Sequence, residues 1–294
     1  MRTSTVRVSG RVNMQLLSAC ALLSILLPSG HANPLPQKDD NDDLYEKAIL
    51  KLRAQSLGLP DKRAGEILST WDPDSGVNPE ELGPYFQGDI LTLPSDKNGI
   101  IDTNFRWADG VIPYSIVDGI FNETELQLLS DAFEAYHNYT CIKFVPYDGN
   151  QTDYIVIQGE DTGCWSSVGR RGGVQYVNLQ PPGCIRKLGT PEHELLHTIG
   201  FHHEQSRTDR DDYVSILWAN IKPLTVYNFF IVNNTSPFGA AYDYGSVMHY
   251  SATAFSSNAL PTIETIPPGI PIGQRDGLSQ SDIDRVNAMY NCFA

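Results

Sequence analysis

The feature that most constrains this chain is the sequence H-E-x-x-H-x-x-G-x-x-H, which begins at His193. His193 and His197 are four residues apart, so a helix would carry both imidazoles on one face. Gly200 can adopt a positive φ, which would end that helix and bring His203 back as a third ligand. Glu194 stands beside the first histidine, where it can reach a water molecule. Three histidines with one open position are typical of a catalytic zinc site, not of a structural one.

A second cluster, Ser246–Tyr250, follows further along the chain. Together with His203–Arg210, which continues the first motif, it resembles the astacin family of metzincin endopeptidases, and the resemblance runs from about Trp107 to Cys292. It implies that Met248 lies under the zinc in a Met-turn. It also implies that Tyr250 is a fifth zinc ligand at rest, and that it then swings away to donate a hydrogen bond to the oxyanion.

The resemblance also implies a reaction and a fold. The expected protein is a zinc-dependent endopeptidase that holds one Zn²⁺ per catalytic domain and acts on proteins or peptides. Glu194 would be the general base toward the attacking water and would later protonate the leaving amine. The expected fold is α+β and metzincin-like (zincin-like), with two lobes. The N-terminal lobe would hold a twisted, mostly parallel sheet and the active-site helix, and the C-terminal lobe would be largely irregular with a terminal helix.

Residues 98–294 are predicted to form this catalytic domain. β-Branched and aromatic residues predict strands, and apolar spacing predicts an amphipathic helix between the first two of them. The expected strands are Val111–Val117, Ile142–Val145, Tyr154–Gln158 and Val174–Leu179, and the expected helix stripe is Leu126, Leu129, Phe133 and Tyr136.

Two later helices carry start signals. Thr190, followed by proline and glutamate, predicts the start of the helix that bears the histidines. Ser279 and Asp282 resemble a capping box, which predicts a final helix near the end of the chain. The expected buried stripe of that helix is Ile283, Val286 and Tyr290.

Residues 1–32 predict a secretory signal peptide, so the protein is expected to be secreted and extracellular. Three arginines precede the apolar run Met14–Leu27, and Gly30–Ala32 offers small residues around a cleavage site. The apolar run is short for a membrane span, and a signal anchor is the alternative. No later segment is apolar enough to cross a bilayer, so no membrane partner is expected.

The cysteines fit an exported protein. Cys20 lies in the signal peptide and leaves with it, and an even set of four remains. Four cysteines allow three disulfide connectivities, among which the sequence alone does not choose. The astacin resemblance implies the pairs Cys141–Cys292 and Cys164–Cys184. Zinc binding by these cysteines is the alternative, but none of them has C-x-x-C spacing.

Charge and sequons complete the picture of an exported enzyme. The formal net charge is −14 and no basic stripe is present, so nucleic acid is not an expected partner. Sequons for N-glycosylation occur along the chain, and each is a weak signal by itself. They begin at Asn122, Asn138, Asn150, Asn233 and Asn234.

Residues 33–97 are predicted to be a propeptide. They are charged and free of cysteine, and Asp43–Ser56 has helical periodicity. The segment Phe86–Asp89 resembles the F-x-G-D switch of astacin propeptides, which implies that the Asp89 carboxylate binds the zinc and keeps the zymogen silent. An ordinary Gly-Asp turn is the alternative.

Activation is predicted by cleavage between Lys97 and Asn98, by a trypsin-like protease. The resemblance implies that the freed amino terminus of Asn98 is then buried against Glu204. Such an ammonium–carboxylate pair needs good geometry to offset desolvation. The alternative is that Glu204 is a surface charge.

Other polar residues near the motifs have lesser expected roles. The spacing selects His203 over His202 as the ligand, so His202 should point elsewhere. His249 is expected to pack or to form hydrogen bonds. The residues Arg207, Asp209 and Arg210 are expected to form a structural ion-pair network, and Arg275 is a candidate for influencing the residue preferred after the cut.

Two other classes of protein compete with an astacin-like enzyme. A binding protein on an inactive protease scaffold is one, but each catalytic element derived above is present. A matrix-type metzincin is the other. It would carry a cysteine switch, and residues 33–97 hold no cysteine. The chain is expected to be a monomer, and its natural substrate is not readable from the sequence.

Overall fold

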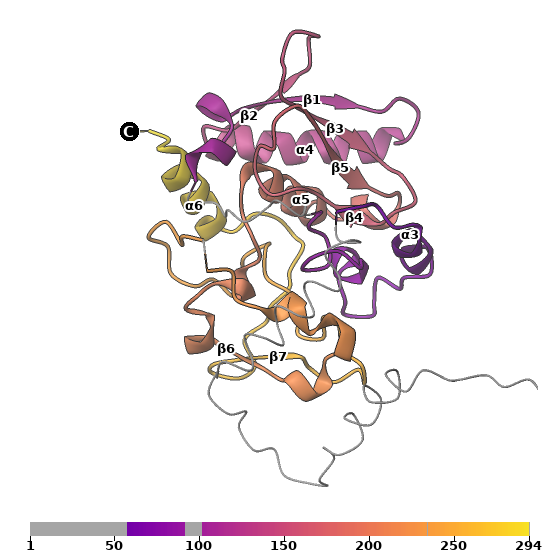
Figure 1. Cartoon of the computed structure of the whole chain (residues 1–294), viewed down its shortest axis with the longest axis vertical. Helices are drawn as coiled ribbons and strands as arrows, with labels where there is room; N and C mark the ends of the chain where they lie inside the picture. Colours follow the sequence, from indigo (N-terminus) through magenta and orange to yellow (C-terminus); the bar gives the residue numbers. More distant parts are fainter. Residues whose placement is uncertain (1–57, 92–101, 234, 294) are drawn as a thin grey trace, which may run out of the picture. The chain divides into compact units, whose positions relative to one another are not determined.

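The computed structural model describes residues 58–91, 102–233 and 235–293 (Figure 1). The predicted signal peptide, the predicted helix at Asp43–Ser56, the Lys97–Asn98 cleavage site and the Asn234 sequon lie outside the described residues. Within the described part of the chain, no helix is both long and apolar enough to cross a membrane.

A five-stranded sheet forms the upper lobe in Figure 1, in the order β2-β1-β3-β5-β4. All neighbouring pairs are parallel except β4 with β5, so the expected mostly parallel sheet is confirmed. The predicted bounds of β3 and β5 are confirmed, β1 ends one residue early, and β2 is shifted by one. The strands are β1 Val111–Ile116, β2 Lys143–Pro146, β3 Tyr154–Gln158, β4 Cys164–Trp165 and β5 Val174–Leu179.

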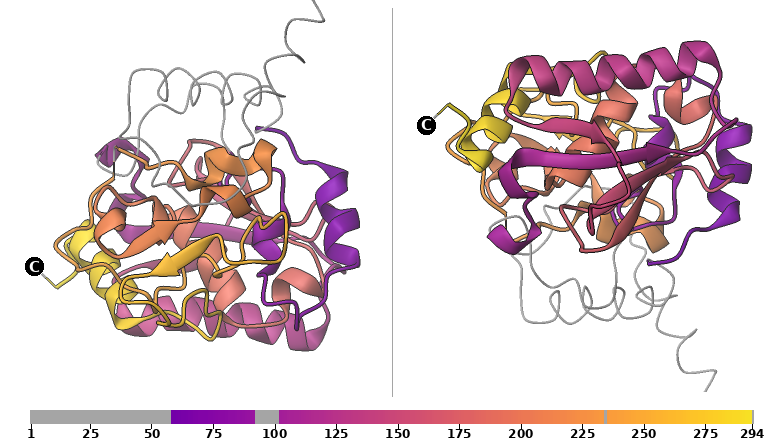
Figure 2. Two further views of the ribbon diagram at one scale, coloured as in Figure 1. Left: turned by 90° about the horizontal axis from the view of Figure 1, so that it is seen from below. Right: turned by 90° about the horizontal axis from the view of Figure 1, so that it is seen from above.

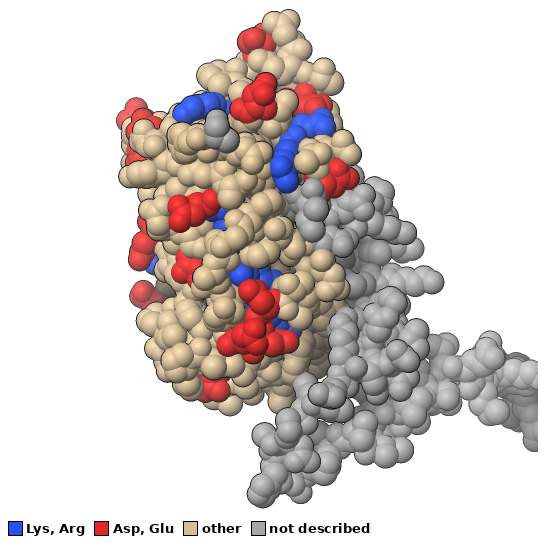
Figure 3. Space-filling view, turned by 90° about the vertical axis from the view of Figure 1, so that its left-hand side faces the viewer, with Lys and Arg blue, Asp and Glu red and all other residues tan. Residues whose placement is uncertain are grey.

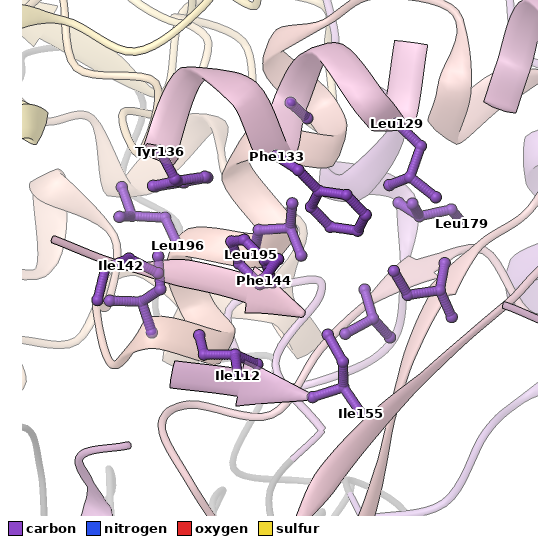
Figure 4. Packing of buried hydrophobic residues seen from close by; sticks show 14 of the residues in the cluster. Ile112, Leu129, Phe133, Tyr136, Ile142, Phe144, Ile155, Leu179, Leu195 and Leu196 are labelled. Carbon is purple, nitrogen blue, oxygen red and sulfur yellow. The ribbon is translucent and has the colours of Figure 1, made fainter. Parts of the chain in front are cut away.

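Two helices, α4 (Glu123–Tyr139) and α5 (Gly189–Ile199), supply the layer that packs on this sheet (Figure 2). Asn122 and Glu125 form a capping box that begins α4. α5 begins one residue before Thr190 and has no side-chain cap. Aliphatic and aromatic side chains fill the space between helices and strands (Figure 4). They include Ile112, Leu129, Phe133, Tyr136, Phe144, Ile155, Leu179, Leu195 and Leu196.

The lower lobe is largely irregular, as expected. It contains one two-stranded sheet, β6 (Val214–Ile216) with β7 (Ile263–Thr265), and its own core cluster around Phe229 and Tyr250. Short 3₁₀ helices occur in all parts of the described chain, not in the lower lobe alone. They span Pro79–Leu82, Thr103–Phe105, Ala108–Gly110, Gly183–Ile185, Glu204–Ser206, Arg210–Asp212, Trp218–Asn220 and Pro223–Phe229.

The final helix α6 (Gln280–Tyr290) begins at the predicted capping box of Ser279 and Asp282. Its predicted buried stripe is partly wrong: Val286 is buried, but Ile283 and Tyr290 are only half-buried. The buried face of the helix instead includes two charged residues beside two apolar ones, and Arg285 forms ion pairs there with Glu204 and Asp282. This face consists of Asp282, Arg285, Val286 and Met289.

Residues 58–91, the described part of the predicted propeptide, run across both lobes (Figure 1). They contain one helix, α3 (Lys62–Ser69), capped by Asp61, whose side chain accepts from the backbone N–H of Arg63. Beyond the 3₁₀ turn Pro79–Leu82, the chain reaches Ile90, which forms a parallel bridge with Ser166 at the edge of the sheet.

Figure 3 shows how acidic and basic side chains are distributed on one face of the molecule. Acidic side chains occur there in small groups interspersed with lysine and arginine. On this face the negative net charge therefore does not form one uniform field.

Candidate metal centre

Helix α5 and the turn behind it position three histidines. His193 and His197 project from one face of α5 and are fully buried. The helix ends at Gly200, whose φ is 135°, and a Cβ there would lie 2.8 Å from the Cε atom of Met289. Glycine alone meets both conditions. The chain therefore turns here and returns His203 to within 5.0 Å of the His193 ring, measured between ring centres.

The three imidazoles converge on the carboxylate of Asp89. Its Oδ2 atom lies 3.0 Å from Nε2 of His193 and 3.1 Å from Nε2 of His203. Its Oδ1 atom lies 3.4 Å from Nε2 of His197. The four ligand atoms are buried and lie within 4.8 Å of one another, a donor set of three nitrogens and one oxygen that suits zinc.

Hydrogen bonds on the far side of the rings direct the ligating nitrogens inward. The Nδ1 atoms of His193 and His197 lie 2.8 and 2.7 Å from the carbonyl oxygens of Val247 and Phe201. These Nδ1 atoms therefore carry the protons, and Nε2 keeps its lone pair. The Nε2 atoms of His193 and His203 are 3.2 Å apart, and that of His197 has no hydrogen-bond partner among the described residues. Such lone pairs repel unless a cation lies between them, so the residues fit a zinc ion.

Burial favours the neutral imidazoles that a metal requires. It lowers the pKa of His203 to about 4 and holds the pKa of His193 well below its usual value. Burial, and next the charge of Asp89, raise the pKa of Glu194 well above its ordinary range. Neither carboxyl oxygen of Glu194 has a hydrogen-bond partner in the described part of the chain. Both oxygens are thus available to a reactant beside the histidines.

The predicted propeptide contacts Tyr250 through Gln87, a residue that the sequence did not single out. The Tyr250 hydroxyl donates to the backbone oxygen of Gln87 at 2.5 Å. The Gln87 side chain accepts from Nδ1 of His203 at 2.9 Å, and the rings of His203 and Tyr250 lie 4.7 Å apart between centres. Gln87 occupies the variable position of F-x-G-D, which is why the motif gave no signal for it.

Met248 lies in the core that supports the site. It is 1% exposed and packs in the same cluster as Leu195 and Leu196 of α5. Its carbonyl oxygen accepts from the backbone N–H of Glu204 at 3.0 Å. The Met-turn is therefore tied to the residue that follows the third histidine.

Two glutamates of the predicted propeptide, Glu80 and Glu81, are buried against the C-terminal part of the chain. Glu80 forms a fully buried ion pair with Arg275. The carboxylate of Glu81 accepts from the backbone N–H and the hydroxyl of Ser251, both at 2.6 Å. The Asn78 side chain adds a donor to the carbonyl oxygen of Gly273 at 3.1 Å. Sequence reasoning missed both glutamates, because a Glu-Glu pair at a turn is common and its partners lie about 170 to 195 residues away.

Glu204 is fully buried, so the alternative of a surface charge is wrong. Its carboxylate forms ion pairs with Arg207 and Arg285 and accepts from the backbone N–H of Asp243 at 2.8 Å. Arg207 also pairs with Asp209. The expected partner of Glu204, the freed amino terminus of Asn98, lies outside the described residues.

The remaining candidates take the following positions. His202 is not part of the ligand group. His249 accepts from the hydroxyl of Tyr242 at 2.7 Å, and burial lowers the pKa of His249 to about 4. Arg210 donates to the carbonyl oxygens of Gln205 and Phe229.

The structure joins Cys141 to Cys292 and Cys164 to Cys184, the pairing that the resemblance implies. The first bridge ties the end of the chain to the segment after α4. The second joins strand β4 to the turn that precedes α5. The described sequon asparagines are exposed, and these are Asn122, which caps α4, Asn138, Asn150 and Asn233.

A parallel-dominated sheet over a helix that bears H-E-x-x-H, with a third histidine behind a glycine turn, defines a zinc metallopeptidase domain. Residues 99–291 match the model of the peptidase family described as Astacin. The chain therefore belongs to the astacin family, whose members are zinc metalloendopeptidases.

Relatives of known identity agree with this assignment. Zinc metalloproteinase nas-13 of Caenorhabditis elegans is 42% identical over 223 residues, which is 74% of this chain and 49% of the relative. High choriolytic enzyme 1 of Oryzias latipes is 38% identical over 227 residues, 74% of this chain and 81% of the relative. The solved structure of that hatching enzyme zinc-protease superposes on this chain with a TM-score of 0.61 and a sequence identity of 41%. The superposition covers 65% of this chain and 96% of the hatching enzyme chain. This chain thus spans about half the length of the nematode relative.

Proposed function

We propose that the protein is a secreted, zinc-dependent endopeptidase that is synthesised as a zymogen. The observation that carries the proposal is the convergence of three Nε2 atoms on the Asp89 carboxylate. The catalytic ligands would be His193, His197 and His203, and Asp89 would complete the set only until activation. The signal peptide would span residues 1–32, the propeptide 33–97 and the catalytic domain 98–294.

Bound zinc would polarise the scissile carbonyl and acidify a water molecule. Glu194 would accept the proton of that water and deliver it to the leaving amine. Burial is the largest cause that raises the pKa of Glu194, and the charge of Asp89 is the second, so departure of Asp89 would lower that pKa toward the range of a general base. Tyr250, released from Gln87, would become a resting zinc ligand and then the hydrogen-bond donor to the oxyanion.

Activation would follow cleavage at Lys97–Asn98 by a trypsin-like protease. The new ammonium of Asn98 would then approach Glu204. Since Glu204 already pairs with Arg207 and Arg285, the ammonium must share that carboxylate with two guanidinium groups. The Asn98 ammonium would thus become a further cationic partner of Glu204, the buried acid that follows the third histidine.

Arg275 is the proposed specificity residue for the position after the cut. In the zymogen its guanidinium pairs with Glu80, which is supplied by the segment that a substrate would replace. A substrate that carries a carboxylate at the corresponding position would restore this pair. The proposed substrates are therefore proteins or peptides with acidic residues near the scissile bond.

The proposed setting is extracellular, with the protein a glycosylated monomer and neither nucleic acid nor a membrane among its partners. The signal sequence, the two disulfides and the exposed sequons support export.

The decisive experiment compares the chain cut at Lys97 with the same chain carrying Glu194→Ala, each incubated with a library of peptides. We expect cleavage by the first alone, with a loss on the order of 1,000-fold or more in the variant, because the general base is gone. Zinc content, measured in parallel, should be equal in both. Cleavage by neither, with zinc present, would favour a binding protein on an inactive scaffold.

A further inference from the structure

Helix α3 packs on the catalytic domain at a place that contains none of the zinc ligands. Gly65 lies so close to the loop after β3 that a Cβ on it would be 2.2 Å from the carbonyl oxygen of Asp161. The side chain of Gln180 bridges this contact: it donates to the carbonyl of Gly65 at 3.3 Å and accepts from the N–H of Gly163 at 2.8 Å. On Gly183, a Cβ would lie 2.7 Å from Cδ1 of Leu68.

We call the four catalytic-domain residues Asp161, Gly163, Gln180 and Gly183 the helix seat. Two of them, Gly163 and Gly183, each precede a cysteine of one disulfide bridge, Cys164–Cys184. The bridge therefore fixes both halves of the helix seat relative to each other without any help from the propeptide. A surface held in this way keeps its shape when its occupant leaves.

The face that α3 presents to the seat is small and apolar. Ala64 is 1% exposed and Leu68 is 5% exposed, whereas Ile67 on the outer side of the same helix is 48% exposed. Departure of α3 would expose this face together with Trp165, which is now 1% exposed. The hydrophobic effect therefore opposes departure.

Tyr85 joins α3 to the inhibitory segment. Its hydroxyl donates to the carbonyl oxygen of Thr162 at 2.7 Å and accepts from the N–H of Asp61, the N-cap of α3, at 2.9 Å. Its ring stacks edge-on against Trp165 with the ring centres 6.2 Å apart. A propeptide held at the helix seat is therefore aligned to place Asp89, four residues further on, among the histidines.

We propose that the helix seat is a docking site of the activated enzyme and that its partner is the excised propeptide, which binds there through α3 and inhibits in trans. The inference rests on the proposed function, since it presupposes the cut at Lys97–Asn98. The α3 contacts described above are all made by residues 61–85 of the predicted propeptide with residues 161–183, so cleavage at that bond would leave each of these contacts in place. The two products then behave as a complex with its own rate of dissociation.

The test uses the full chain with a carboxy-terminal affinity tag and the recognition sequence of a site-specific protease at residues 94–97. After the cut, the chain is immobilised, and the propeptide that remains is followed by gel while cleavage of a short peptide is recorded. Leu68→Ala and Ile67→Ala form a matched pair. Both variants shorten an aliphatic side chain of α3, but Leu68 is buried in the helix seat and Ile67 is exposed. A third variant, Gly65→Ala, introduces the clash with Asp161.

We expect the unaltered propeptide and Ile67→Ala to stay bound through the washes, and Leu68→Ala and Gly65→Ala to leave at least tenfold faster. Peptidase activity should rise at the rate of each release. Equal release from all four chains, or complete loss of the unaltered propeptide during the first wash, would overturn the inference.

A second measurement does not depend on the folding of altered chains. Excised propeptide with Leu or Ala at position 68 is added back to unaltered enzyme freed of its own propeptide. Inhibition by the unaltered peptide at concentrations at least tenfold lower supports the helix seat, and equal inhibition refutes it. Retention is read without activity, so a chain that cleaves no peptide even after its propeptide has been removed would instead refute the proposed function.

Discussion

A single carboxylate occupies the point on which the imidazoles of this protein converge. Asp89 is fully buried, yet it comes from a segment more than 100 residues before the nearest of its histidine partners. In the proposed zymogen, departure of this oxygen ligand opens the metal position to a water molecule and so separates the silent protein from the active one. The residues whose roles are most sharply testable are therefore those that touch this point.

Asp89→Ala should give peptidase activity in the uncleaved chain, because the histidines lose the ligand that fills the open position. Activity would be measured on a short peptide with the Lys97–Asn98 bond verified intact by mass spectrometry. The exposed propeptide residue Asp74 provides the control, and Asp74→Ala should stay silent. An Asp89→Ala zymogen as silent as the unaltered one would contradict the switch.

Tyr250→Phe should retain zinc and lose roughly 100-fold in kcat after activation, since only the hydrogen bond to the oxyanion is removed. Burial raises the pKa of Tyr250 well above its ordinary value, so its hydroxyl carries a proton while it donates to Gln87. Zinc content and kcat would be measured together. Tyr176→Phe, at a half-exposed position on β5, is the control. Unchanged kcat in Tyr250→Phe would remove the proposed role.

At the scale of elements, the final helix supports the metal centre through its first turn. The capping-box residue Asp282 accepts from the hydroxyl of Ser246 at 2.6 Å and from the N–H of Val247 at 2.9 Å. Val247 in turn presents its carbonyl to Nδ1 of His193. One carboxylate therefore begins α6, fixes the Met-turn and, through it, orients the first histidine.

Asp282→Ala should weaken zinc retention by about 10- to 100-fold, because the Met-turn carbonyl no longer has a fixed position against His193. The free energy of unfolding should fall by about 1–3 kcal/mol, since buried donors lose their acceptor. Chelator competition and thermal unfolding would measure the two effects. Asp284→Ala, on the exposed side of α6, should change neither. A loss of stability with unaltered zinc retention would show that Asp282 only caps α6 and does not orient His193.

At the scale of the whole molecule, residues 58–91, the described part of the proposed propeptide, meet the catalytic domain through buried acids. Glu81 faces Glu80, Arg275 and Ser251, and burial raises the pKa of Glu81 to about 7 from an ordinary value of 4.5. Below pH 4.5 the group is protonated whether docked or released. Between pH 4.5 and about 7, Glu81 holds the proton only while residues 58–91 are docked on the catalytic domain. Its contribution to docking is therefore complete at low pH and is lost as the pH rises through about 7.

The propeptide of the cut chain should accordingly dissociate faster at about pH 8 than at about pH 5.5, with zinc kept in the buffer. Glu81→Gln should flatten this dependence, because an amide does not titrate. Release from an immobilised chain across this range is the measurement, and Glu66→Gln on the exposed side of α3 is the control. An equally steep dependence in Glu81→Gln would assign the titration to another group.

The sequence by itself determined what depends on neighbours along the chain. Periodicity located the strands β3 and β5 and the helix α4, Ser279 and Asp282 marked the start of α6, and the spacing of one motif gathered three histidines. These features rest on local backbone preferences and on the pitch of a helix, which a sequence displays directly.

Only the tertiary structure decided which distant polar groups meet. It paired Glu80 with Arg275, placed Gln87 between Tyr250 and His203, and turned α6 so that Arg285 faces Glu204 in place of Ile283. Residue spacing does not predict such pairs, because the partners are far apart in the sequence. Each partner supplies the opposite charge or the hydrogen-bond acceptor that a buried group needs. The need for a partner is visible in the sequence, but its identity emerges only when the two lobes and residues 58–91 are packed together.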